Sequence, residues 1–453
     1  MTTKFDPTDY DHFSYDGYSM SDDGAEFRAD YSLAGPAGRL TFTETVRLPG
    51  QDAPLRRPSD RTARLLALAG GLSYYKAAAP RKVHVMFGLT DAEHAFLVQL
   101  IRNGLGEFAF RNQLLRALTP EVVSERLDAA PHAVEPSSAG GDRPALVPVG
   151  GGKDSVVTIE SLKRAGFEPT LFSVNTFTPI ERCAAVSGLR LVSARRSIDR
   201  RLLTINDDGA YNGHVPVTAI NSLIAVLTAE RLAMGPVVMS NERSAAHGNV
   251  EWHGLSINHQ WSKSLQFEEL LRSTLSAGGG DGNAYFSLLR PLGEVEIARR
   301  FSKLHRYFST FTSCNRAFAL DENRRIGAWC RKCAKCQFVF LILAPFVPQV
   351  ELTRVFGGNL FEDSENIPGY LEILGLRGHK PFECVGEYEE AALTLSMVRR
   401  DPAWMRYAVV RRLAEELRDQ GKVPAADVQD TLLATGSRHF VPPRFLGALD
   451  ALA

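Results

Sequence analysis

Hydrophobic and polar positions follow two different periods along the chain. Up to about residue 60, short runs alternate apolar and polar side chains, as in Leu40-Thr41-Phe42-Thr43-Glu44-Thr45-Val46, which is typical of half-buried strands. From residue 62 to about residue 118, apolar side chains recur at helical spacing, and residues 82–87 interrupt them with the pattern of a buried strand. These patterns predict a smaller N-terminal α+β region over residues 1–126.

A stretch with the composition of a linker follows. Residues 127–144 are rich in Pro, Gly and Ser. After them, apolar strand patterns at 145–149, 169–174 and 236–240 alternate with helical patterns at 155–165 and 218–234. Alternation of this kind predicts an α/β domain with a doubly wound parallel sheet over residues 145–384, and residues 385–453 form a mostly helical C-terminal region in this interpretation.

Composition and charge exclude several classes of protein. Apolar residues make up 44% of the chain and charged residues 23%, which is typical of a folded globular protein. Lys plus Arg and Asp plus Glu each number 52, so no overall positive charge favours a nucleic-acid partner. The longest apolar run, residues 338–347, is about half the length of a membrane-spanning helix. The first residues lack the apolar stretch of a secretory signal, so we expect a cytoplasmic protein without a membrane partner. The oligomeric state is left open.

The first candidate for chemistry is a glycine loop. An apolar strand pattern at 146–149 runs directly into Gly150-Gly151-Gly152-Lys153-Asp154-Ser155, and a helical pattern follows. Glycines let backbone N–H groups approach phosphate oxygens, and a helix N-terminus favours anions. Three glycines are also typical of a flexible turn, but the strand before them and the helix after them favour phosphate binding. The Gly-Lys-Ser/Thr ending of the common nucleotide loop is absent, so γ-phosphate transfer is not implied.

The second candidate is a group of cysteines. Cys330, Cys333 and Cys336 form two consecutive C-x-x-C steps, and Cys314 lies a short distance before them. Four thiolates at this spacing can close a tetrahedral Zn²⁺ site, which we favour over an iron–sulfur cluster or reactive thiols. Cys183 and Cys384 lie outside the group and are interpreted as small buried residues.

Polar residues concentrate in two further segments, 241–247 and 258–263. They contain Glu242, Arg243, His259 and Lys263, and they lie between predicted strands and helices of the α/β domain. Each residue alone is also typical of a helix cap or a surface position. Their density next to the glycine loop makes these segments the candidate substrate site.

The glycine loop resembles the Ser-Gly-Gly-x-Asp-Ser loop of the PP-loop ATP pyrophosphatases, with Gly150 in place of the serine. Members of this superfamily cleave ATP to AMP and pyrophosphate, usually while they adenylate an oxygen of the substrate. The resemblance implies that Gly151, Gly152, Asp154 and Ser155 hold the pyrophosphate with Mg²⁺, and that Ser173-Val174-Asn175 lies near the adenosine. Gly150 removes one expected contact, which Lys153 can replace.

Two further similarities point to nucleobase-modifying PP-loop enzymes. His214-Val215-Pro216-Val217-Thr218 falls where these enzymes carry a Tyr-Val-Pro-x-Arg-Asn segment, and the four cysteines are similar to the zinc site of the deazapurine-nitrile synthases. No arginine follows Pro216, which argues against the nitrile reaction but not against ATP binding. A nucleobase-modifying or RNA-thiolating enzyme stays one alternative, and a zinc-ribbon module that binds nucleic acid or protein stays another.

Most of the chain is similar to the ATP-dependent UDP-N-acetylmuramoyl-L-alanyl-L-glutamate epimerases of bacterial cell-wall synthesis. The sequences that carry the resemblance are Val-Gly-Gly-Gly-Lys-Asp-Ser, Met-Ser-Asn-Glu-Arg-Ser-Ala, Asn-His-Gln-Trp-Ser-Lys-Ser and Trp-Cys-Arg-Lys-Cys-Ala-Lys-Cys. Such enzymes convert the terminal L-glutamate of a UDP-muramoyl dipeptide to D-glutamate and release AMP and pyrophosphate. The resemblance implies ATP as cosubstrate, Mg²⁺, and a structural Zn²⁺.

The chemistry of that reaction suggests roles for the candidate residues. An α-proton beside a carboxylate is poorly acidic, whereas adenylation of the carboxylate lets the carbanion delocalise as an enolate that donors can stabilise. As a hypothesis, Lys153 and Mg²⁺ neutralise phosphate charge, and His259 or Glu242 transfers the proton, with His214 as a second candidate. Lys263 or Arg243 would meet the carboxylate or the diphosphate of the substrate.

Overall fold

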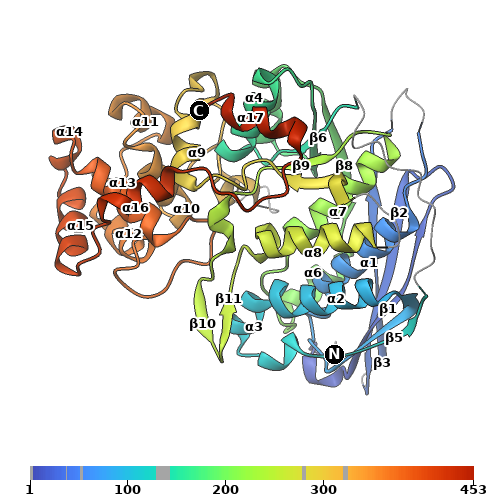
Figure 1. Ribbon diagram of the computed structural model, residues 1–453. Helices are drawn as coiled ribbons and strands as arrows, with labels where there is room; N and C mark the ends of the chain where they lie inside the picture. Colours follow the sequence, from blue (N-terminus) through green and yellow to red (C-terminus); the bar gives the residue numbers. More distant parts are fainter. Residues whose placement is uncertain (1–3, 37, 51–54, 129–142, 278–281, 320–324) are drawn as a thin grey trace.

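A single large sheet organises the chain in the computed structural model (Figure 1), which describes residues 4–36, 38–50, 55–128, 143–277, 282–319 and 325–453. The sheet has ten strands in the order β12-β9-β6-β7-β8-β3-β2-β1-β4-β5. The strands are β1 His12–Met20, β2 Glu26–Gly35, β3 Gly38–Arg47, β4 Lys82–Leu89, β5 Glu121–Arg126, β6 Leu146–Pro148, β7 Thr170–Val174, β8 Leu191–Ser197, β9 Val237–Met239 and β12 Tyr285–Ser287. A separate two-stranded ribbon joins β10 Val250–Trp252 to β11 Leu255–Ile257.

Helices cover this sheet and extend beyond it. They are α1 Asp60–Tyr75, α2 Asp91–Gly104, α3 Gly106–Asn112, α4 Lys153–Arg164, α5 Thr178–Ser187, α6 Arg200–Asp207, α7 Val217–Arg231, α8 Leu265–Ser276, α9 Glu294–Phe301, α10 Ala334–Leu343, α11 Gln349–Phe356, α12 Ile367–Ile373, α13 Tyr388–Val398, α14 Pro402–Met405, α15 Ala408–Asp419, α16 Ala426–Leu433 and α17 Leu446–Asp450. The helices α11 to α16 gather at the end of the molecule opposite the strands β1 to β3 (Figure 1).

The predicted parallel α/β arrangement is confirmed for the middle of the chain. Strands β12, β9, β6, β7 and β8 are parallel to one another. Alternate residues of these strands face two cores: Val147 and Leu171 belong to one, and Leu146 and Phe172 to the other. Since both faces are covered, the strands are apolar throughout, as the sequence pattern required.

The sheet as a whole is mixed rather than purely parallel. The strands β1, β2 and β3 form antiparallel pairs, and β3 joins β8 antiparallel through Thr45, Val46 and Arg47. The N-terminal strands therefore continue the sheet of the α/β half. The alternation of apolar and polar residues along β3 correctly predicted a half-buried strand. That alternation carries no information about which strand lies beside β3. Of the predicted linker at 127–144, residues 129–142 lie outside the described residues.

A buried ion pair lies at this junction. The guanidinium of Arg196 on β8 donates to both carboxylate oxygens of Glu44 on β3 at 2.9 Å, and it also contacts the Ser73 hydroxyl at 3.0 Å. The Glu44 side chain is fully buried and that of Arg196 is 7% exposed. Breaking a buried pair costs more than the pair contributes, because one charge stays in the interior without compensation.

We expect Arg196→Met to lower the free energy of unfolding by about 3–5 kcal/mol, since it leaves the Glu44 carboxylate buried and unpaired. Urea unfolding measures the change. The matched control is Arg47→Met, which removes the exposed pair to Glu26 on neighbouring strands and should cost about 0–1 kcal/mol. Equal losses in both variants would contradict a special role for the buried pair.

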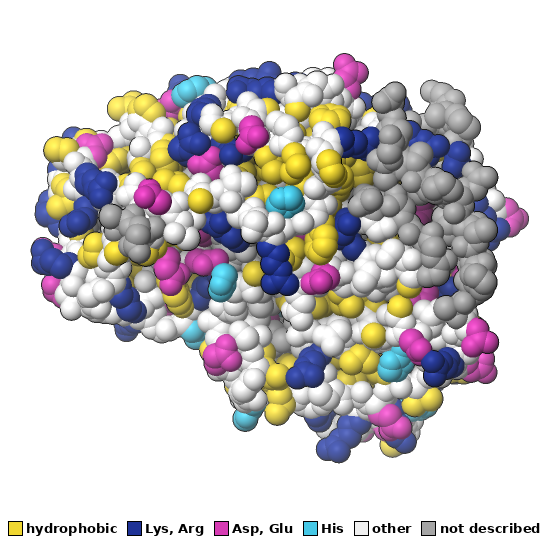
Figure 2. Space-filling model, viewed as in Figure 1, with side chains coloured by type: hydrophobic (Ala, Val, Ile, Leu, Met, Phe, Trp, Pro, Cys, Tyr) yellow, Lys and Arg dark blue, Asp and Glu magenta, His cyan; other side chains and the backbone are white. Residues whose placement is uncertain are grey.

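The helices α13 and α15, together with the shorter helices around them, span residues 388–450. On the face in Figure 2, the described Lys and Arg side chains are interspersed with Asp and Glu side chains, in keeping with equal numbers of both signs. Among the described residues, none of the helices is long and apolar enough to cross a membrane.

Candidate active site

The glycine loop lies at the point where the strand order reverses. Strand β6 pairs with β7 on one side and with β9 on the other, and the chain reaches β9 only after it has completed β7 and β8. Ligands of open α/β sheets bind in the crevice at the carboxyl ends of strands at such a point. The loop at 150–152 leaves the carboxyl end of β6 and leads into α4. The fold therefore places the predicted phosphate-binding loop at the edge of the sheet where ligands of such folds bind.

Two glycines shape this loop. Gly151 adopts a φ of +76°, a conformation that other residues rarely adopt, and an added Cβ would meet the backbone of Pro179 at 3.2 Å. Gly152 is the N-cap residue of α4 and offers no capping side chain. The N–H groups of the first turn are therefore available to an anion. The Ser155 hydroxyl donates to the carbonyl of Gly152 at 3.0 Å and closes the turn.

Lys153 does not point into open space. Its side chain is 1% exposed, and its ammonium contacts the carboxylates of Asp154 and Glu294. The carboxylate oxygens of Asp154, Glu242 and Glu294 lie within 4.8 Å of one another. These three acidic residues form the carboxylate cluster, which joins the first turn of α4, the segment after β9 and the N-terminus of α9.

Burial governs the electrostatics of the carboxylate cluster. Burial and the negative charges of Asp154 and Glu242 raise the pKa of Glu294 to about 7 despite the attraction of Lys153. Burial also acts on Asp154, but Lys153, Lys335 and Lys263 outweigh it and keep the pKa of that carboxyl below its usual value. Three carboxylates that converge in this way suit Mg²⁺, which takes oxygen ligands and is commonly held by one or two carboxylates together with substrate phosphates.

Three further lysines surround the carboxylate cluster. Lys263 and Lys335 both act on the Asp154 carboxylate, as stated above. Lys380 is 3% exposed, and its ammonium nitrogen has no hydrogen-bond partner among the described residues. Burial lowers the pKa of Lys380, although Glu387, Glu390 and Glu242 act in the opposite direction. A buried ammonium without a partner is costly, so a ligand that brings acceptor oxygens would be stabilised there.

A second group of titratable residues lies next to the first. Nδ1 of His259 is 2.5 Å from Oε2 of Glu107, and Nδ1 of His214 is 3.8 Å from the same oxygen. The two imidazole rings are 4.3 Å apart, measured between their centroids. Arg111 donates to the other oxygen of Glu107 at 2.6 Å. His214, His259 and Glu107 form the histidine cluster below.

The two imidazoles have opposite pKa shifts. Burial lowers the pKa of His214 to about 4, with a further contribution from the positive charge of His259. Burial acts on His259 as well, but hydrogen bonds to Cys384 and Glu107 raise its pKa to about 9. At neutral pH the first ring is therefore a neutral base and the second a protonated acid. Such a pair is the arrangement that proton-transfer catalysis uses.

Arg290 connects the segment that carries Glu242 with the segment that carries His259 and Lys263. The buried Arg290 donates to the carbonyl of Glu242 at 2.5 Å and to the carbonyl of Lys263 at 2.6 Å, and its charge is paired with Glu268 at 3.1 Å. A single guanidinium thus fixes the backbone of both polar segments. The carboxylate of Glu242 and the imidazole of His259 are therefore carried by two segments that one buried side chain holds together.

Other predicted site residues are engaged in structural contacts. The guanidinium of Arg243 donates to the carbonyls of Leu432 and Ala434 at 3.0 and 3.1 Å and so holds the C-terminal helices. The side chain of Asn175 pairs with both backbone groups of Arg196 on β8. Ser173 lies near the end of β7, and its hydroxyl contacts that of Thr176 at 2.5 Å. The backbone of Val174 pairs with β8.

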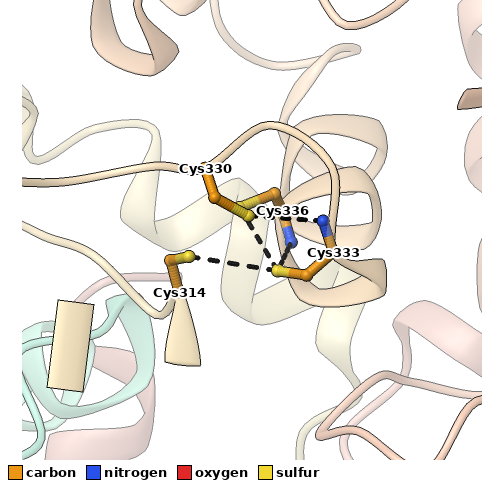
Figure 3. A group of neighbouring side chains, drawn as sticks. All are labelled: Cys314, Cys330, Cys333 and Cys336. Atoms are coloured by element: carbon orange, nitrogen blue, oxygen red, sulfur yellow. Dashed lines mark hydrogen bonds between the residues drawn. The ribbon is translucent and has the colours of Figure 1, made fainter. Parts of the chain in front are cut away.

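The four predicted cysteine ligands converge (Figure 3). Sγ of Cys333 is 4.0 Å from that of Cys314 and 3.5 Å from that of Cys336, and the sulfurs of Cys330 and Cys336 are 3.7 Å apart. Sulfurs at the corners of a tetrahedron around Zn²⁺, each about 2.3 Å from the metal, would be about 3.8 Å apart. Backbone N–H groups of Cys333 and Cys336 donate to two of the sulfurs, as thiolates require. The donor set therefore fits a tetrahedral metal ion.

Comparison with known proteins identifies the family. Residues 4–288 match the family model of the MurL N-terminal domain, and residues 310–428 match that of the MurL C-terminal domain. The chain belongs to the MurL family. It is 45% identical over 449 residues to a Micromonospora protein named UDP-N-acetyl-alpha-D-muramoyl-L-alanyl-L-glutamate epimerase, a match that covers 97% of this chain and 98% of that protein.

Two further relatives carry the same name. The protein of Salinispora tropica is 44% identical, over 98% of this chain and 96% of its own length. That of Xanthomonas oryzae pv. oryzae is 40% identical, over 89% of both chains. No solved structure matches the chain. These matches confirm the resemblance to this epimerase family that the sequence motifs indicated.

In this MurL family chain the segment that leads into the four-cysteine group (Cys314, Cys330, Cys333 and Cys336) is hydrogen-bonded to the glycine loop. The N–H of Thr312, two residues before Cys314, donates to the carbonyl of Gly151 at 2.9 Å. Lys335 lies between two of the cysteines in α10, and its ammonium contacts the backbone carbonyl of Cys384. A metal ion at the centre would hold both contacts in place, so we interpret it as structural.

We expect the purified MurL family chain to contain about one zinc ion, and Cys333→Ser to lose it together with part of the thermal stability. Metal analysis and thermal unfolding are the measurements. Iron with visible absorbance would instead indicate an iron–sulfur cluster. A wild-type protein that contains no metal and is no more stable than Cys333→Ser would contradict the metal centre.

Sequence reasoning missed several residues of this MurL site. Glu107, Glu294 and Lys380 carry no motif, and only contact with a known candidate identifies them. Lys335 lies within the cysteine motif, but the motif does not show that its charge acts on Asp154. Glu294 had one local signal, since an acidic residue at a helix N-terminus is favourable, but that signal is common to most helices. Cys384 was interpreted as a small buried residue, whereas its sulfur is 3.1 Å from the ammonium of Lys263.

Proposed function

We propose that this chain is an ATP-dependent epimerase that converts the terminal L-glutamate of UDP-N-acetylmuramoyl-L-alanyl-L-glutamate to D-glutamate in peptidoglycan precursor synthesis. The relatives named for this reaction match nearly the whole chain. The observation that carries the proposal is the position of the glycine loop. The loop leads into the N-terminus of α4, which can bind an anion, and the carboxylate cluster lies directly beside it. The histidine cluster next to them contains one neutral and one protonated imidazole.

In the first step, the terminal carboxylate of the substrate attacks the α-phosphorus of ATP and displaces pyrophosphate. The N–H groups at the start of α4 bind the phosphates in our proposal, and Lys153 balances their charge. Asp154, Glu242 and Glu294 are the residues that would hold Mg²⁺, which supplies charge neutralisation to the phosphates when bound. The loop fits the PP-loop ATP pyrophosphatases, and this assignment remains part of the proposal.

In the second step, the α-proton is removed. The neutral imidazole of His214 can accept it, and the protonated imidazole of His259 can deliver a proton. Glu107 contacts both rings and fixes their orientation. Glu242, the other candidate for proton transfer, lies with the carboxylates, and we propose it there as a ligand.

The substrate carries a diphosphate and carboxylates, so its site needs cations. Lys263, Lys335 and Lys380 lie next to the carboxylate cluster and are the cations that we propose for these anions. Arg243 was the other candidate, but its guanidinium is engaged by backbone carbonyls of the C-terminal helices.

The experiment that tests the proposal is incubation with ATP, Mg²⁺ and the UDP-muramoyl dipeptide in deuterated water. We expect AMP, pyrophosphate, deuterium at the glutamate α-carbon and D-glutamate, all dependent on the dipeptide. AMP without α-deuterium would indicate a ligase or transferase that also adenylates a carboxylate. No AMP at all would overturn the proposal and direct attention to nucleobase or RNA substrates.

A further inference from the structure

Cys384 lies in the site, and none of the proposed steps uses its sulfur. Its sulfur is 3.1 Å from the ammonium of Lys263 and accepts a hydrogen bond from His259. His259 in turn contacts Glu107 at 2.5 Å. A thiol that contacts an imidazole, which in turn contacts a carboxylate, is an arrangement that activates a nucleophile. The imidazole acts as the base, and the carboxylate orients it.

The backbone around Cys384 is fixed by polar contacts from three different segments of the chain. The side chain of Asn249 donates to the carbonyl of Pro381 at 2.7 Å and accepts from the N–H of His259 at 2.8 Å. The Gln260 side chain donates to the carbonyl of Val385 at 3.1 Å, and Lys335 contacts the carbonyl of Cys384 itself. The segment that carries the thiol is therefore held against the segment that carries His259.

The surroundings of the sulfur favour its anionic form. Burial alone would raise the pKa of the Cys384 thiol, but the positive charges of Lys263, Lys335 and His259 and the hydrogen bond from His259 hold it well below its usual value. A thiolate stabilised to this degree is a weak acceptor for the proton of a carbon acid. It remains a nucleophile toward an activated acyl group, because nucleophilicity falls more slowly than basicity.

We propose that Cys384 takes the glutamyl group from the acyl adenylate and holds it as a thioester while the α-carbon is epimerised. This inference rests on the proposed function. The sulfur attacks the acyl carbon, a C–S bond forms, and the bond from that carbon to the phosphate oxygen breaks, with AMP leaving as the anion. After proton removal and return at the α-carbon, water adds to the acyl carbon, the C–S bond breaks, and the thiolate and a free carboxylate are regenerated.

The thioester has a chemical advantage for this reaction. Sulfur donates less electron density to the carbonyl than the oxygens of the free carboxylate do, so the α-proton of the thioester is more acidic and the enolate is better stabilised. The covalent bond also holds the α-carbon near His214, whose ring lies 4.3 Å from that of His259. Lys263, released from its ion pair when the thiolate is acylated, becomes free to interact with the negative charge of the enolate.

The test uses His214→Gln, in which proton removal is blocked, so the thioester is expected to accumulate. The full-length variant is mixed with ATP, Mg²⁺ and the UDP-muramoyl dipeptide, quenched with acid and measured by intact mass. We expect an added mass of the substrate less one water, located on the peptide that contains Cys384 and removed by neutral hydroxylamine. Adding Cys384→Ala to this variant should abolish the adduct. Rapid acid quench of the wild-type enzyme is the second measurement if His214→Gln does not fold.

Cys384→Ala alone separates this inference from the proposed function. We expect it to release AMP by slow hydrolysis of the adenylate but to incorporate no deuterium at the α-carbon, and Cys384→Ser should behave in the same way. Wild-type levels of α-deuterium in Cys384→Ala, or AMP release without any protein adduct in both trapping experiments, would overturn the thioester and leave the epimerase intact. Wild-type protein that forms no AMP would overturn both.

Discussion

Lys153→Met is expected to abolish dipeptide-dependent AMP release and to destabilise the fold at the same time. The ammonium is buried between Asp154 and Glu294, and Glu242 lies within 4.8 Å of both carboxylates. Removing a cation in direct contact with both carboxylates leaves uncompensated charge in the interior, which costs about 3–5 kcal/mol. The loss of charge on the phosphates should lower the rate of AMP formation by about 100-fold or more.

A double variant separates the effect of Lys153 on stability from its effect on activity. Lys153→Met combined with Glu294→Gln removes one charge of each sign, so we expect it to recover most of the free energy of unfolding in urea but none of the AMP release. Lys163→Met in the same helix is the control, because Lys163 is 28% exposed and its loss should cost about 1 kcal/mol or less. Normal AMP release by Lys153→Met would refute the assignment of Lys153 to the phosphates.

His214→Gln is expected to decrease deuterium incorporation at the α-carbon by about 100- to 10,000-fold while AMP is still formed. Glutamine keeps a polar side chain of similar size beside Glu107 but cannot act as a base. His12→Gln on β1 is the control: its ring contacts Asp11 and is stacked on His84, far along the sheet, so exchange should be unchanged. Loss of AMP formation in His214→Gln would mean that this residue serves the first step instead.

The same assignment predicts the pH dependence of α-deuterium exchange in the wild-type enzyme. His214 must be neutral, so the rate should fall as the pH decreases toward its pKa of about 4. His259 must be protonated, so the rate should fall as the pH increases past its pKa of about 9. We expect a plateau between these limits, and in His214→Gln the decline on the acid side should disappear from the residual rate. An acid limb that persists in this variant would belong to another group.

The glycine loop shows how far sequence reasoning reached. Its apolar strand, three glycines and following helix are consecutive in the chain, so the local pattern already predicted a strand-loop-helix unit, and the structure confirms it in β6 and α4. The C-x-x-C steps are equally local, and the four predicted ligands do converge. The metal ion, the bound ATP and the membership of the PP-loop superfamily remain predictions.

The histidine cluster shows where that reasoning stopped. His214 and His259 were candidates, but the residue that orients both, Glu107, lies on α3, in the predicted N-terminal α+β region. Its role depends on contacts between distant segments of the chain. The interpretation of Cys384 as a small buried residue left out its charged neighbours for the same reason, because Lys263 and His259 come from another segment of the chain.

The sequence by itself determined the features that depend on consecutive residues: the apolar strands, the glycine loop, the cysteine spacing and the resemblance to a family. Only the tertiary structure decided that the N-terminal strands continue the central sheet through β3 and β8, and which ionisable side chains share the site. The physical reason is the range of the interactions. Backbone conformation and hydrophobic period are set within one or two turns of chain, whereas burial, ion pairing and the resulting pKa shifts depend on neighbours that folding brings together.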